Sequence, residues 1–171
     1  MNRAAGVALF VAIGAGTGAV TAAAAAPAIE VVEFRQSDDA LRATYAKDKT
    51  MNLPRLLLLD ARGRPLLLEV GMRNGVGRRL AKALENGKPL ASPATLDRVL
   101  SEVVDAGGKP VAMADLPRAD DYVVDYWAQW CAPCRVLARD IEGQLKRWDD
   151  KHVVWIKIES DPEKLPEDGR N

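Results

Sequence analysis

The sequence predicts an α/β sandwich with a mixed central sheet. Apolar segments typical of strands alternate with amphipathic segments typical of helices in both halves of the chain, a pattern found where helices cover a sheet. A hairpin at 56–70 adds an antiparallel pair to this alternation. Apolar residues make up 48% of the 171-residue chain, which is enough to bury the core of one ordinary domain.

The first half contains a strand, a helix and the hairpin. Residues 29–34 alternate in polarity and are rich in residues that favour strands. Ser37 is a suitable N-cap for a short helix that runs through about Lys47. Residues 56–59 and 65–70 are separated by an Asp- and Gly-containing turn, so we expect them to pair as the two strands of the hairpin.

Helical spacing returns after the hairpin. Residues 76–85 carry apolar side chains four apart and are followed by Gly87, which ends the predicted helix. A second helix is expected to start near Ser92, with an apolar face that continues to Val104. Residues 110–113 indicate a weak strand.

The last part of the chain predicts a strand, a helix and a strand in succession. Residues 122–128 are strongly apolar, and a Cys-x-x-C pair follows them directly. A helical stripe then extends from Cys134 to about Asp149. Residues 153–158 form the final predicted strand.

The charge balance and the N-terminal segment limit the kinds of partner and the cellular location that we expect for this protein. Basic and acidic residues balance at 24 each, which argues against nucleic acid or an anionic membrane as the main partner. Residues 1–26 have a short basic start, an uncharged stretch and an alanine run, which is the pattern of a cleaved signal peptide. The alternative is an uncleaved anchor helix, although the stretch is Gly-rich and only weakly hydrophobic. We therefore expect a periplasmic or secreted protein.

The two cysteines of the chain form one closely spaced pair, Cys131 and Cys134. A disulfide-stapled secreted scaffold uses more cysteines at wider spacing, and a loop this short adds little stability. The partial positive charge at a helix N-terminus favours a thiolate. We expect Cys131 to be the exposed, attacking thiolate and Cys134 to be the shielded, resolving thiol. Pro133 stiffens the first helical turn, and Trp130 offers an apolar flank to a partner chain.

Two other interpretations of the cysteine pair stay open at this stage. One is a purely structural disulfide. The other is half of a zinc site shared by a dimer, although the single histidine, His152, lies beyond the predicted helix and tetrahedral zinc needs more ligands. We predict no metal and no cofactor other than the redox-active disulfide itself.

Residues 123–135, VVDYWAQWCAPCR, resemble the active-site segment of thioredoxins and of periplasmic thioredoxin-like reductants. The resemblance extends to residues 153–163 and implies a thioredoxin-like three-layer sandwich. It places Asp125 at the position of a buried acid that assists proton transfer to the resolving cysteine, and Lys157 at the position of that acid's partner. From the residues alone, an exposed strand residue is the less favoured alternative interpretation of Asp125.

The order of segments differs from that of thioredoxins, in which the active-site half comes first. Residues 52–85 resemble the missing second half, with Pro54 as the cis-proline and Leu53 before it, both facing the substrate. This suggests a circularly permuted domain, in which 29–34 and 153–158 compete for one central strand position. The rival account is a degenerate N-terminal domain before a truncated thioredoxin half that a partner chain completes.

The permuted account divides the chain into consecutive parts. After the signal peptide at 1–26, residues 29–86 supply the second-half-like segment, 87–108 a linker with a helix, and 109–165 the active-site half. Residues 166–171 form a tail.

The expected function is thiol-disulfide oxidoreduction of exported proteins that contain disulfides. The Ala-Pro dipeptide between the cysteines resembles reducing members of the family, which implies a reductant or isomerase supplied with electrons by a membrane thiol protein. The alternatives are a thioredoxin-like binding or assembly subunit and a redox sensor of low turnover.

Overall fold

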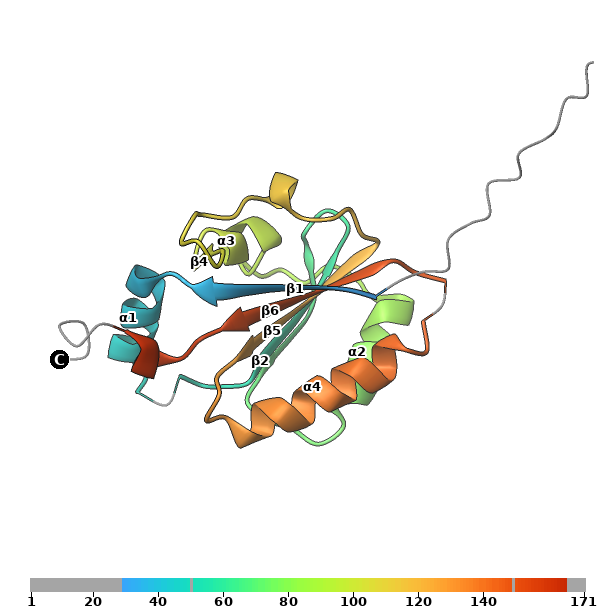
Figure 1. Ribbon diagram of the computed structural model, residues 1–171. Helices are drawn as coiled ribbons and strands as arrows, with labels where there is room; N and C mark the ends of the chain where they lie inside the picture. The colour runs from blue at the N-terminus through green and yellow to red at the C-terminus, as the bar shows by residue number, and fades with distance from the viewer. Residues whose placement is uncertain (1–28, 50, 149, 166–171) are drawn as a thin grey trace, which may run out of the picture.

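A computed structural model describes residues 29–49, 51–148 and 150–165, which form one mixed sheet with helices on both faces (Figure 1). The six strands lie in the order β3-β2-β5-β6-β1-β4. Their bounds are β1 Ile29–Gln36, β2 Arg55–Asp60, β3 Pro65–Val70, β4 Val103–Val104, β5 Asp121–Trp127 and β6 Val153–Glu159. The α/β class predicted from the sequence is confirmed.

In the described part of the chain, four α-helices and two short 3₁₀ turns accompany the strands. The helices are α1 Asp38–Lys47, α2 Val76–Asn86, α3 Leu96–Leu100 and α4 Ala132–Leu145, and the turns are η1 Met113–Asp115 and η2 Pro162–Lys164. Ser37 caps α1 as expected, because its Oγ accepts the N–H of Ala40.

Strand β6 occupies the centre of the parallel part of the sheet. It pairs in parallel with β5 on one side and with β1 on the other. Strand β2 pairs antiparallel with both β5 and β3, so the hairpin extends the sheet beyond β5. Of the two segments that competed for the central position, 153–158 therefore takes it, and 29–34 lies one strand further out.

Each face of the sheet has its own apolar core. On one face, α2 and α4 bury their stripes against the sheet, with Leu80, Ile141 and Val123 fully inaccessible. On the other face, α3 and the 111–116 segment cover Val124 and Ile156. Figure 1 shows α2 and α4 together on one side of the sheet and α3 on the other. Successive side chains of a strand thus point to opposite faces of the sheet and pack into different cores.

The segment between α2 and β5 differs from the sequence-based expectation. The helix expected from Ser92 is only the five-residue α3, which Thr95 caps by accepting the N–H of Arg98. Val103 and Val104 form β4 instead, paired antiparallel with the end of β1. The prediction of a longer helix was wrong because these β-branched residues satisfy a sheet edge that periodicity along the chain does not reveal.

The weak strand predicted at 110–113 is also absent. Pro110 makes a single isolated bridge to Val104, and the chain then enters η1. A proline lacks the N–H that a ladder needs, which explains why pairing stops there.

Within the part of the chain that the structure describes, no helix is long and apolar enough to cross a membrane. The predicted signal peptide at 1–26 and the tail at 166–171 lie outside the described residues.

Candidate functional site

The cysteine pair lies where β5 ends and α4 begins. Cys131 and Cys134 form a disulfide with a Cα–Cα distance of 5.3 Å. Cys131 is the N-cap of α4, and its Sγ accepts the backbone N–H of Cys134 at 3.1 Å. A donor N–H and a helix N-terminus both stabilise negative charge, so this position favours a thiolate on Cys131 once the bond is reduced.

The exposure predicted for Cys131 was wrong. Cys131 and Cys134 are each only 3% exposed, so the two cysteines are shielded equally in the oxidised protein. Ala128 forms a small cluster with them, and Leu53 and Trp127 pack against it. Its position at a helix end gives Cys131 its hydrogen bond, while Leu53 from a distant segment and the nearby Trp127 pack over the cysteine cluster.

The 53–54 segment meets the disulfide from the other half of the chain. The Leu53–Pro54 peptide bond is cis, as the resemblance implied. The carbonyl of buried Pro54 accepts the N–H of Gly71. Among the described residues, the backbone of Leu53 makes no backbone hydrogen bond, so its N–H and C=O are unpaired beside the cysteines.

Asp125 is buried on the α4 side of the sheet, with 1% of the residue exposed. Neither carboxylate oxygen has a hydrogen-bond partner within the described part of the chain. Burial raises the pKa of Asp125 to about 7, and the nearby charge of Lys157 opposes that rise. The alternative of an exposed strand residue is thereby excluded.

A cavity of about 160 Å³ lies between Asp125 and Cys134. Its walls include Asp125, Cys134 and Lys157, and also Trp127 and Arg135. The volume is sufficient for ordered water. Asp125 is therefore placed to exchange a proton with Cys134 through a water molecule.

Lys157 lies beside Asp125 but pairs elsewhere. The two residues are register partners on β5 and β6. The Nζ of Lys157 donates to Glu33 Oε1 at 3.0 Å and lies 5.3 Å from the centre of the Trp127 ring. Lys157 thus acts on Asp125 only through the electrostatic effect of its charge, and its ion pair is with Glu33 of β1. The direct pairing of Lys157 with Asp125 that the resemblance implied is not made.

Trp130 and Pro133 form the exposed rim of the site. Trp130 is 46% exposed, and its indole N–H donates to Asp161 Oδ1 at 3.0 Å. The same oxygen accepts the N–H of Glu163, so the start of η2 holds the indole in place. Pro133 is exposed in the first turn of α4.

Sequence reasoning missed three contributors to the site. Asp161 anchors Trp130, Glu33 pairs with Lys157, and Trp127 covers both the disulfide and the cavity. The Asp161-Pro162 dipeptide is a cap signal that could have located the first contributor. No local signal marks Glu33, because parallel pairing of β1 with β6 brings it to Lys157.

Comparison with known proteins assigns the active-site region to a known group. Residues 112–168 match the thioredoxin family model. The match covers the disulfide and the elements β5, α4 and β6, whose residues line the Asp125 cavity, and it also includes η2. The matched residues make up about a third of the chain.

Individual relatives show similarity in the same region. A thioredoxin of Buchnera aphidicola is 41% identical over 46 residues, which is 26% of this chain and 43% of that protein. A thioredoxin of Rickettsia bellii is 41% identical over 54 residues, covering 31% of this chain and 48% of its own length. The chain thus matches less than half the length of these curated relatives. No solved structure matches significantly.

Proposed function

We propose that this protein is a thiol-disulfide oxidoreductase that acts on exported proteins as a reductant or isomerase. One observation carries the proposal: a disulfide at the N-terminus of α4 shares a cavity with a buried, unpaired carboxyl group. A structural disulfide has no need of a costly buried acid beside it. Similarity of residues 112–168 to thioredoxins supports the same chemistry.

The proposed exchange begins with the reduced pair. The Cys131 thiolate attacks one sulfur of a substrate disulfide, and the other substrate sulfur leaves as a thiolate and takes a proton from water. Cys134, once deprotonated, attacks the Cys131 sulfur of the mixed disulfide and releases the second substrate thiolate. The protein ends with the Cys131–Cys134 disulfide, and two electrons have passed to the substrate.

Asp125 is the proposed acceptor of the Cys134 proton. A pKa of about 7 lets the carboxyl group accept and return a proton near neutral pH. The cavity provides the route, since it is bounded by both side chains.

An extended substrate segment would lie between the exposed Trp130–Pro133 rim and Leu53. Leu53 contributes unpaired backbone groups beside the disulfide, and an extended chain can hydrogen bond to such groups. Trp130, held by Asp161, supplies a fixed apolar surface.

We also propose that the domain is a circularly permuted thioredoxin-like domain, with 29–86 supplying the second half and 87–108 the connection. The contact of Leu53 with the cysteine cluster supports this order of parts. So does the pairing of β2 with β5, because the chain's own hairpin occupies the sheet edge that a partner would otherwise complete.

The signal-like pattern of residues 1–26 supports an oxidising compartment, the periplasm or the exterior. A reductant there needs an electron donor, and we propose a membrane thiol protein for this role. A redox-sensing or binding subunit of low turnover is the second candidate, favoured by the burial of both cysteines in the oxidised state.

Trapping of a mixed disulfide tests the proposed function. Reduced Cys134→Ser protein, incubated with insulin, should accumulate a covalent complex through Cys131, because no resolving thiol remains. Mass spectrometry of the alkylated mixture measures it. Cys131→Ser protein is the matched control, since it loses the same disulfide and should form at least about tenfold less complex. Equal trapping through either cysteine would contradict the assignment of roles.

A further inference from the structure

A large cavity lies away from the cysteines, between α1 and α3. Its volume is about 840 Å³, which suits a small organic molecule. Its walls come from α1, the 51–55 segment, the end of β3, and α3 with the residues just after it. None of the cysteine cluster or the Asp125 cavity belongs to this lining.

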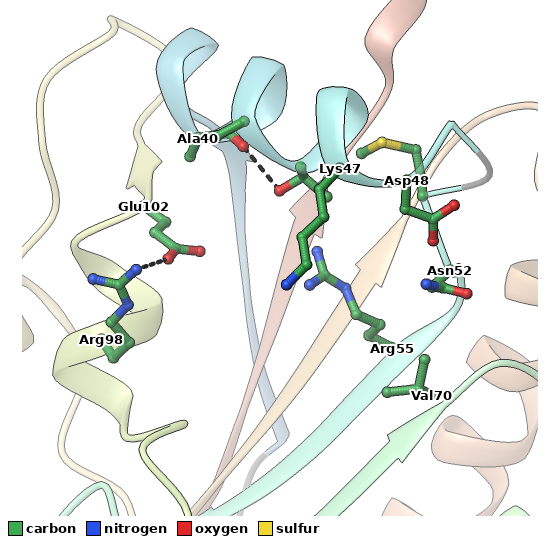
Figure 2. Close-up of a pocket in the computed structure, with 11 residues that line it drawn as sticks. Ala40, Lys47, Asp48, Asn52, Arg55, Val70, Arg98 and Glu102 are labelled. Atoms are coloured by element: carbon green, nitrogen blue, oxygen red, sulfur yellow. Dashed lines mark hydrogen bonds and ion pairs between the residues drawn. The ribbon is translucent and has the colours of Figure 1, made fainter.

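Two cationic side chains converge in this cavity. Figure 2 shows that Lys47 of α1 and Arg55 of β2 both direct their charged ends into it. Neither forms an ion pair with any residue of 29–49, 51–148 or 150–165. Two like charges that line one cavity repel each other, and a bound anion would relieve that repulsion.

Arg55 supplies an independent observation. Its Nε and Nη2 atoms are buried and have no hydrogen-bond partner among the described residues. The guanidinium carbon lies over the Tyr126 ring, 4.3 Å from its centre. Buried donors without acceptors are rare in folded proteins and call for an explanation. Arg55 therefore carries a charge that no residue of the described chain compensates, at the wall of a cavity where a carboxylate or phosphate group would compensate it.

The other residues that line the cavity indicate which chemical groups the rest of a ligand would carry. Arg98 and Glu102 form an ion pair of 2.8 Å on the α3 wall, so Arg98 is partly neutralised. Ala43, Met51 and Val70 give the cavity apolar surface. Asp48 also lines it, and Figure 2 shows its carboxylate turned toward the Asn52 side.

We propose that this cavity is a binding site for a small organic anion, whose carboxylate or phosphate group is held by Lys47 and Arg55. The apolar or neutral body of the ligand lies against the Met51 and Val70 walls. Inorganic phosphate and succinate are the probes that separate the two oxyanion chemistries.

Calorimetric titration of the oxidised full chain at low ionic strength tests the site. At least one probe should bind saturably at one site per chain. Arg55→Gln and Lys47→Gln should each weaken binding about tenfold or more, because each removes a charge-assisted contact. Arg62→Gln, which removes a cation from the exposed hairpin turn, should change it less than about twofold. Lys47 is exposed at the end of its helix, so its variant should fold even if Arg55→Gln does not.

A variant that should bind the anion probes more tightly provides a second part of the experiment. Glu102→Gln frees Arg98 from its partner and removes a negative charge from the wall, so binding should tighten about two- to fivefold. The proposal is overturned if neither probe saturates, if Lys47→Gln binds as tightly as Arg62→Gln, or if Glu102→Gln does not tighten binding.

Discussion

Replacing Cys131 by serine should abolish the reduction of insulin disulfides, with a loss of about 10³-fold or more relative to the unaltered protein. A serine hydroxyl is not ionised near neutral pH and forms no disulfide, so the attacking group is lost while the N-cap oxygen still accepts the Cys134 N–H. The initial rate of insulin precipitation, with dithiothreitol as electron source, measures the effect.

The matched control for this loss is a conservative change on the same rim. Trp130→Phe keeps an aromatic side chain, removes only the hydrogen bond to Asp161, and leaves both cysteines in place. It should retain activity within about tenfold, since a single hydrogen bond contributes about 1 kcal/mol. Insulin reduction by Cys131→Ser at the unaltered rate would show that Cys131 is not the nucleophile.

Replacing Asp125 by asparagine should stabilise the oxidised protein at pH 8 by up to about 4 kcal/mol. The pKa of this carboxyl rises from 3.8 in the unfolded chain to about 7 in the folded protein, and each unit corresponds to about 1.36 kcal/mol. An asparagine amide is also buried without a partner, but its desolvation costs less than that of a carboxylate. Urea unfolding at several pH values measures the difference.

The pH dependence distinguishes this effect from a general change in packing. Between about pH 4 and pH 7 the folded protein binds one proton more than the unfolded chain at Asp125, so its stability falls as pH rises through this window. Above pH 7 the full cost of the buried charge is present, and near pH 4 it vanishes. The stabilisation by asparagine should therefore grow from near zero at pH 4 to its maximum above pH 7.

Asp140→Asn is the matched control for the stability measurement. It makes the same chemical change on an exposed position of α4, where the charge is already in water. Its effect should stay within about 0.5 kcal/mol at every pH. A pH-independent effect of Asp125→Asn, or destabilisation at pH 8, would refute the description of Asp125 as a buried, unpaired acid.

Local signals predicted most elements because the chain satisfies them within a few residues. Ser37 caps its own helix, and the apolar stripe of α4 lies against the sheet, as its period requires. The wrong predictions concern segments whose secondary structure depends on pairing with a strand far away in the sequence. Val103 and Val104 fit a helical face equally well, and only the free edge of β1 makes them a strand.

The residues of the candidate site also fall into two groups, those that the sequence could locate and those that it could not. The chemistry of Cys131, Cys134 and Asp125 is encoded in one continuous segment, so the resemblance could locate it. Two other contributors come from segments far along the chain, which sheet pairing brings to the site. They are Leu53, which packs against the cysteine cluster, and Glu33, which pairs with Lys157. The cavity proposed to bind an anion has no sequence motif, since Lys47 and Arg55 come to line it only through the packing of α1 beside β2.

The reduction potential of the Cys131–Cys134 disulfide tests the central claim most directly. It can be measured on the full chain by equilibration with glutathione or dithiothreitol buffers, followed by alkylation and mass analysis. A redox-active pair should give a value between about −270 mV and about −120 mV, and a reductant should fall near the lower limit. A value below about −300 mV, which is typical of structural disulfides, would contradict the proposed function.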